Sequence, residues 1–181
     1  PGHWKLRLTV DTELQPGVPD QRLLDRLTEA FPGLARHQCR VDPQRRSRRT
    51  TGAAILLLNS DSGANQAHLL EHLILEVLRG IGIRSRLSGV TCAYSSPPER
   101  NDVFVECEDE GSGDLAAALA IEVLNAALAG ESLAPRYPDV IQCTRVLRSD
   151  GARLWPVGRL AQRAQLPWDR AAAALGLLER G

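Results

Sequence analysis

The sequence has few aromatic residues, a single lysine and no excess of charge of either sign. Aromatic residues are 4% of the 181 residues, and 22 basic side chains balance 22 acidic ones. A balanced chain has no overall field that would attract nucleic acid or an anionic surface. No apolar run reaches the roughly 18 residues of a membrane span, and we find no signal-peptide pattern. We therefore expect a cytoplasmic protein without a membrane partner.

Closely spaced cysteines are also lacking, because the four cysteines lie far apart, at Cys39, Cys92, Cys107 and Cys143. None of them forms a C-x-x-C pair, which argues against a zinc ribbon and against a disulfide framework. We expect all four to be small, buried, apolar residues in a reducing compartment.

Hydrophobic periodicity predicts an α+β fold. Alternation of apolar and polar residues predicts strands at 4–10 and 102–107, a short aliphatic run predicts another at 53–58, and residues 84–94 are a strand or hairpin arm. Helical spacing predicts helices at 23–31, 66–79 and 115–129, the last capped by Asp114. This order of elements favours helices packed on a largely antiparallel sheet.

The character of the chain changes after Pro135, so we expect a domain at 1–134 and a small, mostly helical module at 135–181. Within this module, residues 139–147 are predicted as a strand and residues 157–165 and 168–179 as helices. The two helices resemble the helix-turn-helix core of winged-helix regulators. The second is rich in alanine and poor in the side chains that read base edges. We therefore expect packing or formation of a homo-oligomer rather than nucleic-acid binding.

The most informative stretch runs from His68 to Glu76 and reads HLLEHLILE. On a helix, His68 and His72 lie one turn apart on the same side. This is the spacing by which one helix offers two imidazoles to a single zinc ion. In such an H-x-x-E-H arrangement the glutamate, here Glu71, is the general base of a metal-dependent hydrolase. The stretch predicts one Zn²⁺ per chain, and a solvated polar helix face is the alternative.

Glu76 is the candidate third metal ligand, because it follows one further turn along the helix. It lies about 12 Å from His68 along the axis, which is near the limit for sharing one ion. Side chains lean toward the helix N-terminus, and this shortens the reach. If Glu76 falls short, it can orient a histidine from outside the metal's ligand set. The other candidates for the third ligand are then Glu106, Glu108 and Glu122.

Several landmarks between residues 23 and 130 together resemble a known family. They are Phe31-Pro32-Gly33-Leu34 with His37 and Cys39 behind it, the stretch from His68 to Glu76, the acidic run VFVECEDE at 103–110, and the helix at 116–128 with Leu124-Asn125 near its end. The chain resembles the N-terminal domain of cyanophycin synthetase. In those enzymes two ATP-dependent ligase domains follow, whereas here we expect a stand-alone domain with a helical tail.

The resemblance implies a metallopeptidase-like hydrolase that cleaves cyanophycin, an arginine-decorated aspartate polymer. Carried over to this sequence, it makes His68, His72 and Glu76 the zinc ligands and Glu71 the base. We add Glu106 and Glu108 as acceptors for substrate guanidinium groups through bidentate hydrogen bonds, with a solvated strand edge as the alternative. A family segment of the form G-x-T-R matches Arg84-Ser85-Arg86 loosely, which makes Arg86 a third candidate substrate-binding residue.

Three functions are weighed at this point. The first is a zinc hydrolase that acts on a peptide or polyamide, either cyanophycin or another Arg-rich or isopeptide substrate. The second is a catalytically silent ligand-binding module, against which the intact Glu71 argues. The third is a DNA-binding regulator that uses the tail, against which the absence of a basic stripe argues.

Overall fold

A three-stranded antiparallel sheet forms one layer of the molecule. The structure is a computed structural model, and it describes residues 4–11, 21–39, 50–51, 64–84, 86–151 and 155–178. The strands lie in the order β1 (Trp4–Asp11), β5 (Arg100–Cys107) and β4 (Gly89–Ala93). A separate two-stranded ladder joins β2 (Gln38–Cys39) to β3 (Thr50–Thr51). The strand predicted at 53–58 lies outside the described residues.

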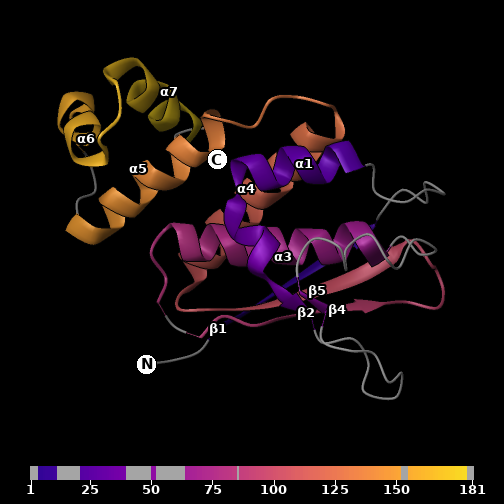
Figure 1. Cartoon of the computed structure of the whole chain (residues 1–181). Helices are drawn as coiled ribbons and strands as arrows, with labels where there is room; N and C mark the ends of the chain where they lie inside the picture. Colours follow the sequence, from indigo (N-terminus) through magenta and orange to yellow (C-terminus); the bar gives the residue numbers. More distant parts are fainter. Residues whose placement is uncertain are drawn as a thin grey trace.

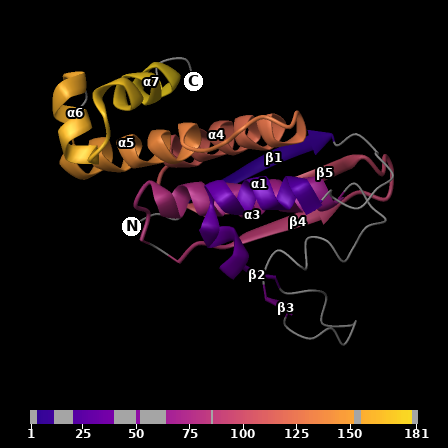
Figure 2. The same cartoon turned by 45° about the horizontal axis from the view of Figure 1, so that its top comes forward.

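Two long helices cover one face of this sheet, as Figures 1 and 2 show. They are α3 (Ala64–Gly80), which lies over β4 and β5, and α4 (Glu110–Leu128), which lies beside α3. Helix α1 (Gln21–Ala30) packs on α4, on the side away from the sheet, and leads into a 3-10 turn, η1 (Pro32–Arg36), that contacts α3. The predicted α+β architecture is confirmed.

The core lies between α3, α4 and the inner face of the sheet. Strand alternation turns Val103 and Val105 inward, where both are at most 1% exposed, and Leu73 and Ile74 of α3 are fully buried in the same core. Helix α4 is long and apolar enough to cross a membrane by length and composition, but over half of its apolar stretch is buried in this structure. Burial against α3 and β5 accounts for its composition as that of a core helix.

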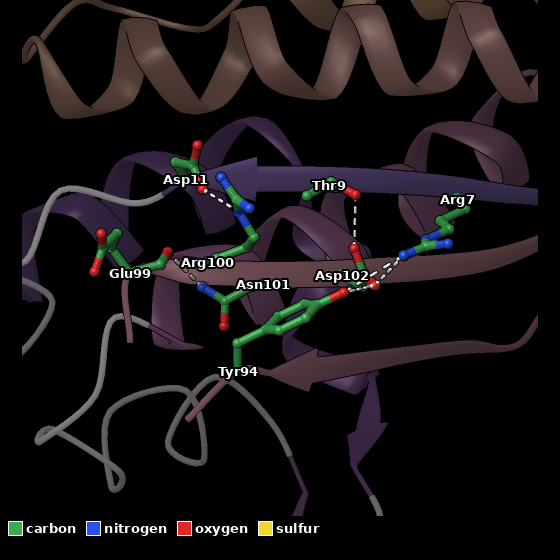
Figure 3. Close-up of polar contacts among 8 residues, drawn as sticks. All are labelled: Arg7, Thr9, Asp11, Tyr94, Glu99, Arg100, Asn101 and Asp102. Atoms are coloured by element: carbon green, nitrogen blue, oxygen red, sulfur yellow. Dashed lines mark hydrogen bonds and ion pairs between the residues drawn. The ribbon is translucent and has the colours of Figure 1, made fainter. Parts of the chain in front are cut away.

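The outer face of the sheet carries a polar network centred on Asp102. Figure 3 shows that Arg7 and Thr9 of β1 and Tyr94, just after β4, all point to the Asp102 carboxylate. The Thr9 and Tyr94 hydroxyls donate at 2.7 and 2.8 Å, and Arg7 donates at 2.7 Å. These hydrogen bonds hold the pKa of Asp102 below its usual range. The network joins all three strands through one carboxylate.

The C-terminal helices pack together at one end of the molecule (Figure 2). They are α5 (Arg136–Asp150), α6 (Val157–Ala164) and α7 (Trp168–Leu178). The strand predicted at 139–147 is therefore wrong: these residues belong to α5, where Val140, Ile141 and Cys143 are buried. A buried helix and a short buried strand share the same apolar composition, so a short window does not separate them.

Helix α5 attaches the tail to the front of the chain through close packing. A Cβ at Gly80, the last residue of α3, would come within 2.6 Å of the Ile141 side chain. Arg170 of α7 in turn binds the buried Asp139 of α5 through two hydrogen bonds, at 2.6 and 2.7 Å. The described part of α7 contains no other arginine, so its basic side chain is engaged within the protein.

Two further predictions need correction. The cap of α4 is Asp109, whose carboxylate accepts a hydrogen bond from the Ser112 backbone N–H at 2.8 Å, and the helix begins at Glu110. The prediction of Asp114 overlooked Glu110–Gly113 because two glycines there hide the helical pattern. Cys92 is exposed, since it lies on the outer face of the edge strand β4, whereas Cys107 and Cys143 are buried as expected.

The corrected cap yields a test of stability. Replacement Asp109→Ala removes the acceptor for the Ser112 N–H and should lower the free energy of unfolding by about 1 kcal/mol. Urea denaturation followed by circular dichroism measures this change. The matched control Asp114→Ala changes an exposed side chain inside the helix and should stay within about 0.5 kcal/mol of the parent protein. Equal losses in the two variants would contradict the assignment of Asp109 as the cap.

Candidate metal centre

Helix α3 carries the polar residues of the site although nearly all of its surface is covered. The sheet covers one side of the helix, and α4 and η1 contact it elsewhere. Glu71 and His72 are only 5% and 4% exposed, so their side chains lie inside the protein. Buried polar groups must be hydrogen-bonded or must bind a ligand, which makes each contact of these side chains informative.

His68 and His72 present their Nε2 atoms to each other at 3.1 Å. Two imidazole nitrogens at this distance share either a proton or a cation. Tetrahedral zinc with bonds of 2.0–2.1 Å would place two nitrogen ligands about 3.3 Å apart, close to the observed separation. The predicted helical spacing therefore brings the two rings into a geometry that fits one ion.

Glu71 completes a compact group of donors. The donor atoms of His68, Glu71 and His72 all lie within 4.8 Å of one another. Oε2 of Glu71 accepts a hydrogen bond of 2.5 Å from the Thr91 hydroxyl of β4. Burial raises the pKa of Glu71, although the Thr91 hydrogen bond and the proximity of His37 work against this shift. A raised pKa brings a carboxyl closer to the range in which it can accept and return a proton near neutral pH.

Strand β4 approaches α3 closely at Glu71 because of a glycine. A Cβ on Gly89 would lie 2.6 Å from Oε1 and 2.7 Å from Cγ of Glu71. Real Cβ atoms essentially never come this close, so any larger residue would displace the carboxylate or the strand. Gly89 thus permits the approach of backbone to side chain that places Thr91 against Glu71.

Glu76 lies on the other side of His72 and is bonded to a residue from a distant part of the chain. Its Oε2 is 2.8 Å from Nε2 of His37, and Nδ1 of His37 is 2.9 Å from Nδ1 of His72. The Glu76 carboxylate is therefore separated from the group of His68, Glu71 and His72 by one imidazole ring. In this structure it contacts His37, whereas the sequence offered Glu76 either as the third metal ligand or as a residue that orients a metal-binding histidine.

The turn η1 fixes His37 at this position. His37 directly follows η1, and its backbone N–H bonds the Leu34 carbonyl. Gly33 lies so close to Glu76 that a Cβ there would overlap the carboxylate. The Phe31-Pro32-Gly33-Leu34 landmark therefore has a structural reason: its glycine lets the turn lie directly on α3, with His37 and Glu76 in contact.

The three candidate substrate-binding residues are elsewhere. Glu106 accepts a hydrogen bond from Ser88 at 2.7 Å and belongs to the outer face of the sheet, because it alternates with Val105 and Cys107. Glu108 and Arg86 are exposed, beyond the end of β5 and in the connection from α3 to β4. Among the described residues, none of the three contacts His68, Glu71 or His72. Glu122 binds Arg136 and Tyr137 on α5 instead.

A comparison with protein families gives a match to the cyanophycin synthase-like N-terminal domain over residues 5–129, more than half of the chain. The chain belongs to this family. Membership relates the protein to cyanophycin metabolism and confirms the resemblance seen in the sequence. The matched region contains β1 to α4 with the whole donor group, whereas α5, α6 and α7 lie beyond it. A search of curated proteins gives no match.

Sequence reasoning missed the roles of His37 and Thr91. No periodicity links either residue to α3, because each reaches the site from a separate element. The available signal was indirect: His37 stands just behind the Phe31–Leu34 landmark, and a chain with four histidines brings three of them together.

Burial of His72 predicts a pH dependence for the metal-free protein. Burial, together with His68 and His37, lowers the pKa of His72 to about 3, from about 6.5 in an unfolded chain. Between these values only the unfolded chain binds the proton. Stability should therefore fall as the pH drops below 6.5, by up to about 1.4 kcal/mol per unit from this histidine.

Urea unfolding in the presence of a chelator, at pH 6.5, 5.5 and 4.5, measures this slope. The variant His72→Gln removes the titrating group and should flatten the slope by about one proton over the same interval. Parallel slopes for the two proteins would show that His72 does not titrate as the structure implies.

Proposed function

We propose that the protein is a zinc-dependent hydrolase that cleaves peptide or isopeptide bonds in cyanophycin or a similar Arg-rich polymer. The observation that carries this proposal is the group formed by the partly buried His68 and the buried Glu71 and His72, in which two imidazole nitrogens face each other beside a carboxylate. Family membership supports the choice of substrate class.

The donor set suits zinc. His68 and His72 would hold the ion through Nε2, and neutral imidazoles are common zinc ligands. Burial lowers the pKa of both histidines, so both are uncharged and able to coordinate at neutral pH. An ion held there supplies Lewis acidity to the reaction.

Glu71 is the residue that moves the proton. Its carboxylate accepts a proton from the attacking water and returns it to the nitrogen of the departing amine, so that one amide and one water give one acid and one amine. Thr91 keeps the carboxylate in place through Oε2. Glu71 is only 5% exposed, and low exposure strengthens the interactions of the carboxylate with charge that develops in the reaction.

The first test is metal content. Protein purified without added metal and without a His-tag should carry near one zinc per chain, measured by elemental mass spectrometry, and His68→Ala should lose it. His72→Ala should do the same, because each variant removes one of two facing nitrogens. The control Arg36→Ala, an exposed change in η1, should keep its metal. Stoichiometric zinc in the two histidine variants would refute them as ligands.

The second test separates the base from the metal ligands. Glu71→Gln keeps the size of the side chain but removes proton transfer, so hydrolysis of cyanophycin should fall at least ~100-fold while zinc stays bound. Release of new amino groups measures turnover, and elemental analysis of the same sample measures zinc. Unchanged turnover in this variant would remove Glu71 from its proposed role.

A further inference from the structure

We infer that His37 and Glu76 are positioning residues that select the tautomer of His72 and thereby set the zinc affinity of the centre. The inference rests on the proposed function, since it concerns the same metal site. It concerns three side chains that form a continuous line from the turn after α1 into α3: Glu76, His37 and His72.

The positions of the hydrogens along this line follow from the acceptor at its end. A carboxylate has no hydrogen to donate, so the 2.8 Å contact between Glu76 and His37 requires a hydrogen on Nε2 of His37. At a pH at which the His37 ring carries only this one hydrogen, Nδ1 of His37 is left as an acceptor. The 2.9 Å contact with His72 then requires a hydrogen on Nδ1 of His72.

The consequence for His72 is that the lone pair lies on Nε2. This is the atom that faces Nε2 of His68 at 3.1 Å, within the donor group. The other neutral tautomer would put a hydrogen on this nitrogen and block coordination. Partners outside the ligand set commonly fix the tautomer of a metal-bound histidine in this way, and their loss typically weakens metal binding 10–100-fold.

Among the side chains that the structure describes, Arg79 competes for the outer end of this line. Its Nη1 lies 3.2 Å from Nε2 of His37 and 3.6 Å from Oε2 of Glu76. Arginine only donates, so a bond to His37 would need the opposite tautomer. The contact between His37 and Glu76, at 2.8 Å, is shorter than the contact between Arg79 and His37, and the Arg79 side chain is 59% exposed. Both observations favour a hydrogen on Nε2 of His37.

The arrangement is held by packing rather than by the polar contacts alone. The His37 side chain is 8% exposed and the Glu76 side chain 15%. Because Gly33 has no side chain, the Glu76 carboxylate can occupy the space that a Cβ at this position would fill. The backbone thus leaves room for this contact.

Zinc affinity, measured by competition with a chromogenic chelator, tests the inference. His37→Leu and Glu76→Leu should each raise the dissociation constant 10–100-fold. The double variant should be no weaker than His37→Leu, within about threefold, because both residues act through one line. His37→Gln should stay within about threefold of the parent, since its amide can accept from His72 and donate to Glu76. The control Glu29→Leu, on the exposed side of α1, should bind zinc as the parent does.

The following results would contradict the inference. Loss of affinity in His37→Gln as large as in His37→Leu would make His37 a metal ligand. A further tenfold or greater loss on adding Glu76→Leu to His37→Leu would mean that Glu76 contacts the metal directly. Parent-like affinity in both leucine variants would reject the relay while leaving the proposed function intact. A parent protein that binds no zinc would overturn both.

Discussion

The burial of α3 is the constraint from which the rest of the site follows. A helix covered by the sheet, by α4 and by η1 would ordinarily be apolar on every side, yet α3 carries Glu71 and His72 in its most buried part. Each polar side chain inside a protein costs free energy unless it is paired. The surrounding elements therefore have to supply partners at fixed positions, and they do so from two sides.

On one side, β4 supplies the Thr91 hydroxyl to Glu71, and Gly89 lets the strand come close enough. On the other side, the turn after α1 supplies His37 to His72 and Glu76, and Gly33 permits that approach. Two glycines thus serve the same purpose on opposite flanks of one helix. The absence of a side chain at each glycine lets Glu71 or Glu76 reach its partner.

The remaining polar features stabilise the framework around this helix. The Asp102 network ties β1, β5 and the end of β4 together on the outer face of the sheet, away from α3 (Figure 3). The capping residue Asp109 also forms an ion pair with Arg148 of α5. This ion pair joins the start of α4 to the C-terminal helices. Neither feature contacts the donor group among the described residues, so their effect on it is to keep β4 and α4 in place.

The sequence by itself determined the alternating strands, the long helices and the pairing of His68 with His72. These depend on local periodicity, and a spacing of four residues on a helix leaves little freedom in where two side chains lie. Local patterns failed where composition is ambiguous, as at residues 139–147, and where glycines hide a helix start, as at 110–113.

Only the tertiary structure decided the partners of those residues. It placed Glu76 on His37, put Thr91 against Glu71 and turned Glu106 to the outer face of the sheet. His37 and Glu76 are 39 positions apart, and Glu71 and Thr91 are 20 apart. Contacts of this kind depend on how whole elements pack, and no pattern within a single helix or strand contains that information.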